Sequence, residues 1–121
     1  MKIQRVEPAR LFSVGIADEK LSHVATISLE ANEQITFLSP EGMEYDLVRK
    51  QWGYYATPSL QGRLRSNGMR AALTRNVETG RIFVVLVEIG KEQLWRAYNA
   101  KERQEFLTWL DELPPQGVSN H

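Results

Sequence analysis

Residues 82–87, Ile-Phe-Val-Val-Leu-Val, constrain the fold more than any other stretch, because they form an unbroken apolar run. Strands with one solvated face alternate apolar and polar residues, whereas strands covered on both faces are apolar throughout. Gly90 follows shortly afterwards and marks the end of the strand. We therefore predict that residues 82–89 form the central strand of a sheet, covered on both faces.

The flanking sequence predicts further strands joined by tight turns. Apolar and polar residues alternate over residues 11–17, 22–30, 34–38 and 44–51, as is typical of half-buried strands. Pro40 and Gly42 predict a turn between the last two of these strands, and Gly80 predicts a second hairpin joining residues 69–77 to 81–89. Turns this short join antiparallel strands, since parallel strands need a crossover of about a dozen residues.

Two helical segments accompany these strands. Thr57 as N-cap, Pro58 in the first helical position and Gly68 as a C-terminal stop predict a short helix over residues 57–67. A helical period over residues 94–113 predicts a second helix, divided near Asn99, although residues 106–110 also fit a last strand. The predicted class is α+β, with two layers: a mainly antiparallel sheet of five to six strands and helices on one face.

Length and composition indicate a single domain over residues 1–121, with an N-terminal arm at 1–10 and a loose C-terminal tail at 114–121. The chain has no cysteine, no apolar leader at its N-terminus and no window close to the roughly 18 apolar residues of a membrane span. We expect a cytoplasmic protein without a membrane partner.

Motifs for catalysis and metal binding are weak. His23 and His121 lack metal-ligand spacing. The sequence contains neither of the two glycine-rich motifs that bind phosphate, Gly-x-x-x-x-Gly-Lys-Ser/Thr and Gly-x-Gly-x-x-Gly. We therefore predict no metal and no cofactor. A nucleophile at Thr57 or Ser59 would lack the turn motif that exposes such a residue. Whether the chain is an enzyme stays open.

The charge distribution points to a binding site. The net charge is zero, but residues 49–81 carry seven basic side chains against Glu78 alone. A helix N-terminus attracts anions, arginine offers forked donors, and aromatic rings stack on bases or sugars. The predicted ligand-binding residues are Lys50, Trp52, Tyr54, Tyr55, Thr57, Ser59, Arg63 and Arg65. The same aromatic residues would alternatively plug the edge of a sheet.

Three functions compete at this point. The first is a non-catalytic binding protein for an anionic ligand: a phosphorylated metabolite, a nucleotide sugar or, less favoured, single-stranded nucleic acid. The second is an oligomeric or accessory subunit that docks a second copy or a partner protein through Trp95, Tyr98 and Trp109. The third is a small enzyme, which a small fold does not exclude.

Residues 45–59, which include Trp-Gly-Tyr-Tyr-Ala-Thr-Pro-Ser, resemble a group of short uncharacterised bacterial proteins. Arg63-Leu64 and Leu73-Thr74-Arg75-Asn76 continue the likeness, which extends over residues 35–113. The resemblance implies a free-standing bacterial domain and carries no activity with it.

Overall fold

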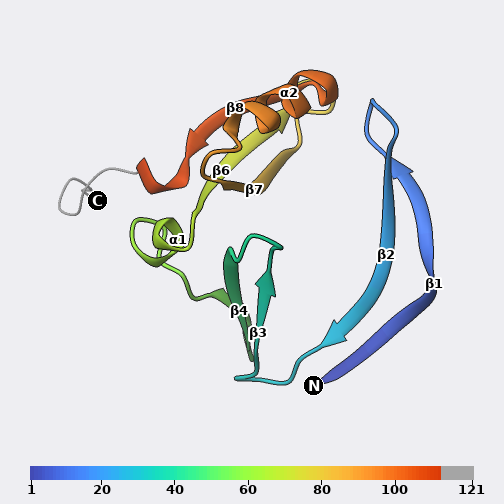
Figure 1. The fold of residues 1–121 in the computed structure, drawn as a ribbon, viewed down its shortest axis with the longest axis vertical. Coiled ribbons are helices and arrows are strands. Elements are labelled where there is room, and N and C mark those ends of the chain that lie inside the picture. Colours follow the sequence, from blue (N-terminus) through green and yellow to red (C-terminus); the bar gives the residue numbers. More distant parts are fainter. Residues whose placement is uncertain (113–121) are drawn as a thin grey trace. The chain divides into compact units, whose positions relative to one another are not determined.

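The structure, a computed structural model, describes residues 1–112, so the tail predicted at 114–121 lies outside the described residues. The chain divides into two compact units, Met1–Pro58 and Ser59–His121. Figure 1 traces the elements in chain order. Each unit has its own sheets.

The first unit begins with a long antiparallel hairpin. Strands β1 (Lys2–Val14) and β2 (Glu19–Ser28) pair with a register shift between Arg5 and Arg10. The turn closes where the Asp18 N–H donates to the Gly15 carbonyl at 3.3 Å. The residues predicted as an arm are thus the first part of β1, and both strands leave apolar side chains such as Leu11 and Val24 exposed.

The second sheet of this unit has the order β3-β4-β5, from β3 (Gln34–Leu38), β4 (Glu44–Lys50) and β5 (Gly53–Ala56). The predicted β3–β4 turn is confirmed: the Ser39 N–H donates to the Met43 carbonyl at 2.9 Å, and Gly42 has a φ of +90°. Strand β5 was not predicted. It folds back on β4 through Gln51 and Trp52, which places the aromatic stretch on a hairpin.

The second unit contains α1 (Arg63–Ser66), β6 (Met69–Asn76), β7 (Ile82–Glu88), α2 (Glu92–Glu102), β8 (Gln104–Trp109) and a short 3-10 helix, η1 (Leu110–Glu112). Its antiparallel sheet has the order β7-β6-β8 (Figure 1). The prediction that residues 82–89 form the central strand is therefore wrong. Strand β6 is central, because β7 pairs with one side of it through a hairpin and β8 returns along the other side after α2.

The helix predicted over residues 57–67 is also wrong. The Thr57 N–H donates to the Asp46 carbonyl at 3.2 Å, so the β4–β5 ladder continues into the predicted cap. Helix α1 is a single turn, which Ser59 introduces by accepting the Arg63 N–H at its hydroxyl, 3.2 Å away. Gly68 does end the helix, as predicted, with a φ of +88°.

The last part of the chain settles the alternative left open for residues 106–110. Helix α2 is undivided at Asn99, where we predicted a break, and ends at Arg103 in the left-handed conformation. The chain then reverses into β8, so the strand is observed. Ala72, Val87 and Trp109 form the core of the sheet, with Val85 and Trp95 packed against them.

Antiparallel strands dominate the described residues, which confirms the coarse part of the predicted class. They form three sheets of two, three and three strands instead of one sheet of five to six. The reason is local: the hairpins β1–β2, β3–β4–β5 and β6–β7 each close on near neighbours in the sequence.

Candidate functional site

The predicted ligand-binding residues divide between the two units. Lys50, Trp52, Tyr54, Tyr55 and Thr57 belong to the first, whereas Ser59, Arg63 and Arg65 belong to the second.

The aromatic residues lie on the surface of the β4–β5 hairpin. Trp52 is 69% exposed, and Tyr54 and Tyr55 are also exposed. A residue that plugs a sheet edge would be covered by its neighbours. The exposure of these three side chains therefore argues against the plug and leaves their rings accessible for stacking.

The cations of this hairpin are already engaged. The Arg49 guanidinium lies 5.1 Å from the centroid of the Tyr54 ring and donates to the carbonyls of Lys50 and Gly53, at 2.6 and 2.9 Å. The Lys50 Nζ donates to Asn32 Oδ1 at 2.7 Å. Arg49 thus stabilises the β4–β5 turn, and Lys50 ties the end of β4 to the turn that precedes β3.

Arginines of the second unit are neutralised in a similar way. Arg70 pairs with Asp111 and Glu112, and Arg75 with Glu105, at 2.7 to 2.9 Å. Arg65 lies 3.8 Å from the Asp111 carboxylate. The excess of positive charge along residues 49–81 therefore loses much of its strength once the chain folds, because the matching carboxylates come from beyond residue 100.

The docking face predicted from Trp95, Tyr98 and Trp109 is largely core. Trp109 is only 9% exposed and lies against Trp95 and Phe106, with ring centroids 5.3 Å apart in each pair. Tyr98 alone of the three is exposed. A larger interaction surface in this unit would have to include other exposed residues.

Strand β7 supplies such a surface. Ile82, Phe83, Val84 and Leu86 are all exposed, Val84 at 67%. Within the described chain, no strand pairs with β7 on the side away from β6. An apolar strand of this length at an open edge is the arrangement that invites pairing with another chain.

Backbone groups at this edge can be assigned from the ladder. The Asn76 N–H donates to the Arg81 carbonyl and the Ile89 N–H to the Gly68 carbonyl, both at 2.8 Å, so Arg81 and Ile89 face β6. Positions facing a neighbour alternate with positions facing away in an antiparallel pair. The residues whose N–H and C=O point to the open edge are therefore Ile82, Val84 and Leu86, joined by the N–H of Glu88.

The opposite edge, β8, is protected. Its pairing with β6 shifts register between Leu73 and Thr74, which leaves Leu107 as an extra residue in a bulge. Its sequence begins with Gln104 and Glu105. Bulges and charged side chains are the devices that prevent edge pairing, and β7 has neither until Glu88 at its end.

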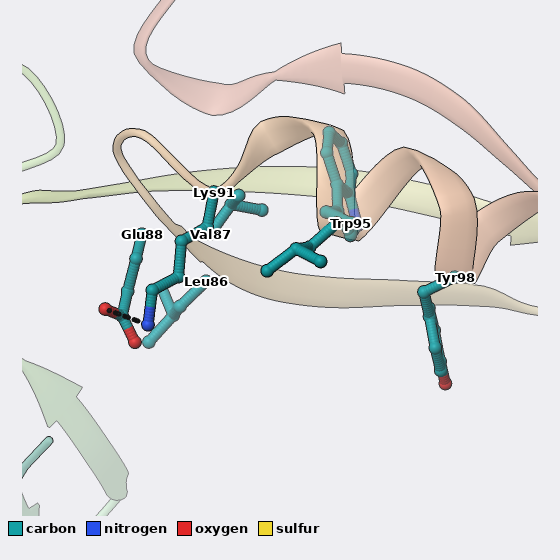
Figure 2. A pocket seen from close by; sticks show the side chains of 7 residues that line it. Leu86, Val87, Glu88, Lys91, Trp95 and Tyr98 are labelled. Carbon is teal, nitrogen blue, oxygen red and sulfur yellow. Dashed lines mark ion pairs between the residues drawn. The ribbon is translucent and has the colours of Figure 1, made fainter. Parts of the chain in front are cut away.

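A shallow hollow of about 280 Å³ lies between β7 and α2. Figure 2 shows its lining, with Tyr98 pointing away from α2 and the Glu88–Lys91 ion pair at 3.2 Å. The buried Trp95 Nε1 has no hydrogen-bond acceptor among the described residues. Because the lining is mostly apolar, the hollow extends the apolar surface of β7 onto the helix.

Within residues 1–112, no group of three or more His, Asp or Glu side chains is placed to hold a metal ion, and no helix has the length and apolar character that crossing a membrane requires.

No protein-family model, curated protein or solved structure matches the chain. A function must therefore be argued from the surfaces described above. Ile82, Val84 and Leu86 are exposed, whereas the apolar run predicted a strand covered on both faces. An apolar strand without proline or internal charge is equally compatible with an edge strand that pairs with another chain.

Proposed function

We propose that this protein is a non-catalytic interaction subunit that binds another protein chain by strand addition at the open edge of β7. The observation that carries the proposal is the coincidence of outward-facing backbone groups with exposed apolar side chains on one unprotected strand. It keeps the accessory-subunit function considered from the sequence, but moves the surface from Trp109 to β7.

A partner strand would stabilise both the backbone groups and the apolar side chains of this edge. The outward N–H and C=O groups of Val84 and Leu86 exchange water for backbone partners, a mode of recognition that gives affinity without special side chains. The exposed apolar area gains about 25 cal/mol for each Å² removed from water. Strand addition is therefore favourable on both counts, whereas small polar ligands would leave the apolar area exposed.

Amide hydrogen exchange tests the proposal. A synthetic peptide with the sequence of residues 81–89, flanked by lysines for solubility, serves as the added strand. We expect the amides of Val84 and Leu86 to be protected in the presence of this peptide, while those of Phe83 and Val85 are protected by β6 in every sample. A peptide N-methylated at four consecutive positions, those of Phe83 to Leu86, is the matched control, since it lacks ladder donors along both of its edges. Fast exchange at Val84 and Leu86 with either peptide and without one would contradict the proposal.

A second candidate function is favoured by the exposure of Trp52, Tyr54 and Tyr55. These rings would stack on the base or sugar of an anionic ligand, in keeping with the nucleotide sugar or phosphorylated metabolite considered from the sequence. It ranks second because Arg49 and Lys50 already have hydrogen-bond partners within the first unit.

The resemblance of residues 45–59 to short bacterial proteins supports a bacterial origin for either function. A chain without cysteine suits the reducing cytoplasm of such a cell.

A further inference from the structure

We infer that the partner strand at β7 is the β7 of a second copy of the same chain, paired antiparallel about Val85. This inference rests on the proposed function and adds the identity of the partner and the register. It starts from a property of the strand: residues 82–88 are apolar from end to end except for Glu88, so the strand can serve as its own complement.

The backbone fixes which registers are allowed. Outward-facing residues must meet outward-facing residues, so a shift by one position would oppose them to groups already bonded to β6. Pairing about Val85 sets Val84 opposite Leu86 of the second copy, and the symmetry repeats the pair. The whole strand then takes part, with Ile82 opposite Glu88 at each end.

Side chains favour the same register. The exposed side chains of Val84 and Leu86 meet on one face, and no like charges stand opposite each other, because Arg81 meets Ile89. Moving the centre to Leu86 would leave Ile82 and Phe83 with no opposite residue in the strand, which ends at Glu88. Moving it to Val84 would set Arg81 against the buried Val87 and lose the pairing of Glu88 with the strand.

The paired sheet explains why residues 82–87 form an unbroken apolar run. Joining two β7-β6-β8 sheets gives one antiparallel sheet of six strands in which β7 is internal. The two-fold axis of an antiparallel pair stands perpendicular to the sheet, so both α2 helices lie on the same face. The two-layer α+β arrangement predicted from the sequence is reached in the pair.

Mass and hydrogen exchange, measured on the full chain, separate the inference from the proposed function. We expect a dimer by light scattering, with the amides of Val84 and Leu86 protected without any added peptide. A monomer in which only the 81–89 peptide gives this protection would overturn the second copy as partner while supporting strand addition. Absence of protection in all samples would overturn both.

Val84→Lys tests whether any dimer uses this edge. The side chain is 67% exposed and its N–H does not face β6, so the unit should still fold, which far-UV circular dichroism checks. We expect the dimer dissociation constant to rise about tenfold or more, because lysine blocks edge pairing. Val24→Lys, at an apolar residue of β2 that is 59% exposed, is the matched control and should leave the dimer intact. A dimer that persists in Val84→Lys would overturn the inference.

Cross-linking tests the register. The chain has no cysteine, so one introduced thiol can only pair with its copy. Residues opposite each other without mutual hydrogen bonds have Cβ atoms about 4.5–5.5 Å apart, close to the disulfide range. We expect Val85→Cys to form a disulfide-linked dimer faster than Val84→Cys, although Val84 is the more exposed. Random collision, or pairing centred on Val84, predicts the reverse order and would overturn the register.

Discussion

Arg70 and Asp111, 41 residues apart in the sequence, form a two-pronged ion pair that holds η1 against the end of β6. The Arg70 Nε and Nη2 donate to the two carboxylate oxygens at 2.9 and 2.7 Å. The Asp111 side chain is 1% exposed, and the Arg70 guanidinium lies 4.0 Å from the centroid of the Trp109 ring. The pair therefore covers the core tryptophan and joins the last described element to the central strand.

Asp111→Asn should destabilise the second unit by about 3 kcal/mol, because it leaves the largely covered Arg70 without its main partner. Urea unfolding measures the loss. Glu112→Gln is the matched control: that carboxylate also accepts from Arg70, at 2.9 Å, but is 61% exposed, so its removal should cost under about 1 kcal/mol. Equal losses in the two variants would show that the covered pair has no special role.

The same pair predicts a dependence on pH. Hydrogen bonds from Arg70 hold the pKa of Asp111 below its ordinary value of 3.8, and they outweigh the opposing effect of burial. A carboxyl with a lowered pKa in the folded state stabilises the fold above its ordinary pKa and loses that contribution as the pH falls through the lowered one. The free energy difference between the wild type and Asp111→Asn should therefore be full near neutral pH and shrink below about pH 4. A difference that stays constant down to about pH 2 would rule out Asp111 as the titrating group.

Two turn glycines give a prediction about backbone strain. Gly42 and Gly80 have φ angles of +90° and +75°, and a Cβ at either position would meet no atom within 4 Å. Valine should thus cost about 1–2 kcal/mol at each site through the backbone alone. Asparagine, which tolerates positive φ better, should cost less at both. Thermal unfolding of the four variants checks this, and valine variants that melt with the wild type would contradict the strain.

Local signals in the sequence located the turns and most strands. Gly42 and Gly80 mark turns because positive φ is a property of single residues and their neighbours. The position of β7 depends instead on which strand reaches the other side of β6, and β8 does so after a helix. An apolar run indicates that a strand is buried, but it does not show whether the same chain or another chain buries it.

The candidate site shows the same limit. The sequence shows how many basic residues lie within 49–81, but it does not show which carboxylates pair with them. Arg70 pairs with Asp111, 41 positions away, and Arg75 with Glu105, 30 positions away. Thr57 carries a good capping side chain, yet its N–H completes the β4–β5 ladder. In each case the local sequence pattern was present, but a contact with a residue elsewhere in the chain decided the structure.

Trp52→Ala separates the two interpretations of the aromatic hairpin. With 69% of Trp52 exposed, its truncation should change the free energy of unfolding by under about 1 kcal/mol, whereas a buried plug would cost about 3–5 kcal/mol. If the hairpin binds an anionic ligand, phosphate, nucleoside monophosphates, a nucleotide sugar or a short single-stranded oligonucleotide should shift the amide signals of Trp52, Tyr54 and Tyr55. A stacking ligand should lose these shifts in Trp52→Ala and keep them in Phe37→Ala, a control at an exposed aromatic residue of β3. Binding through charge should also weaken from low to moderate salt. If none of these compounds shifts the hairpin at low salt, the ligand site is excluded for these classes, and strand addition at β7 stands as the function that the surface supports.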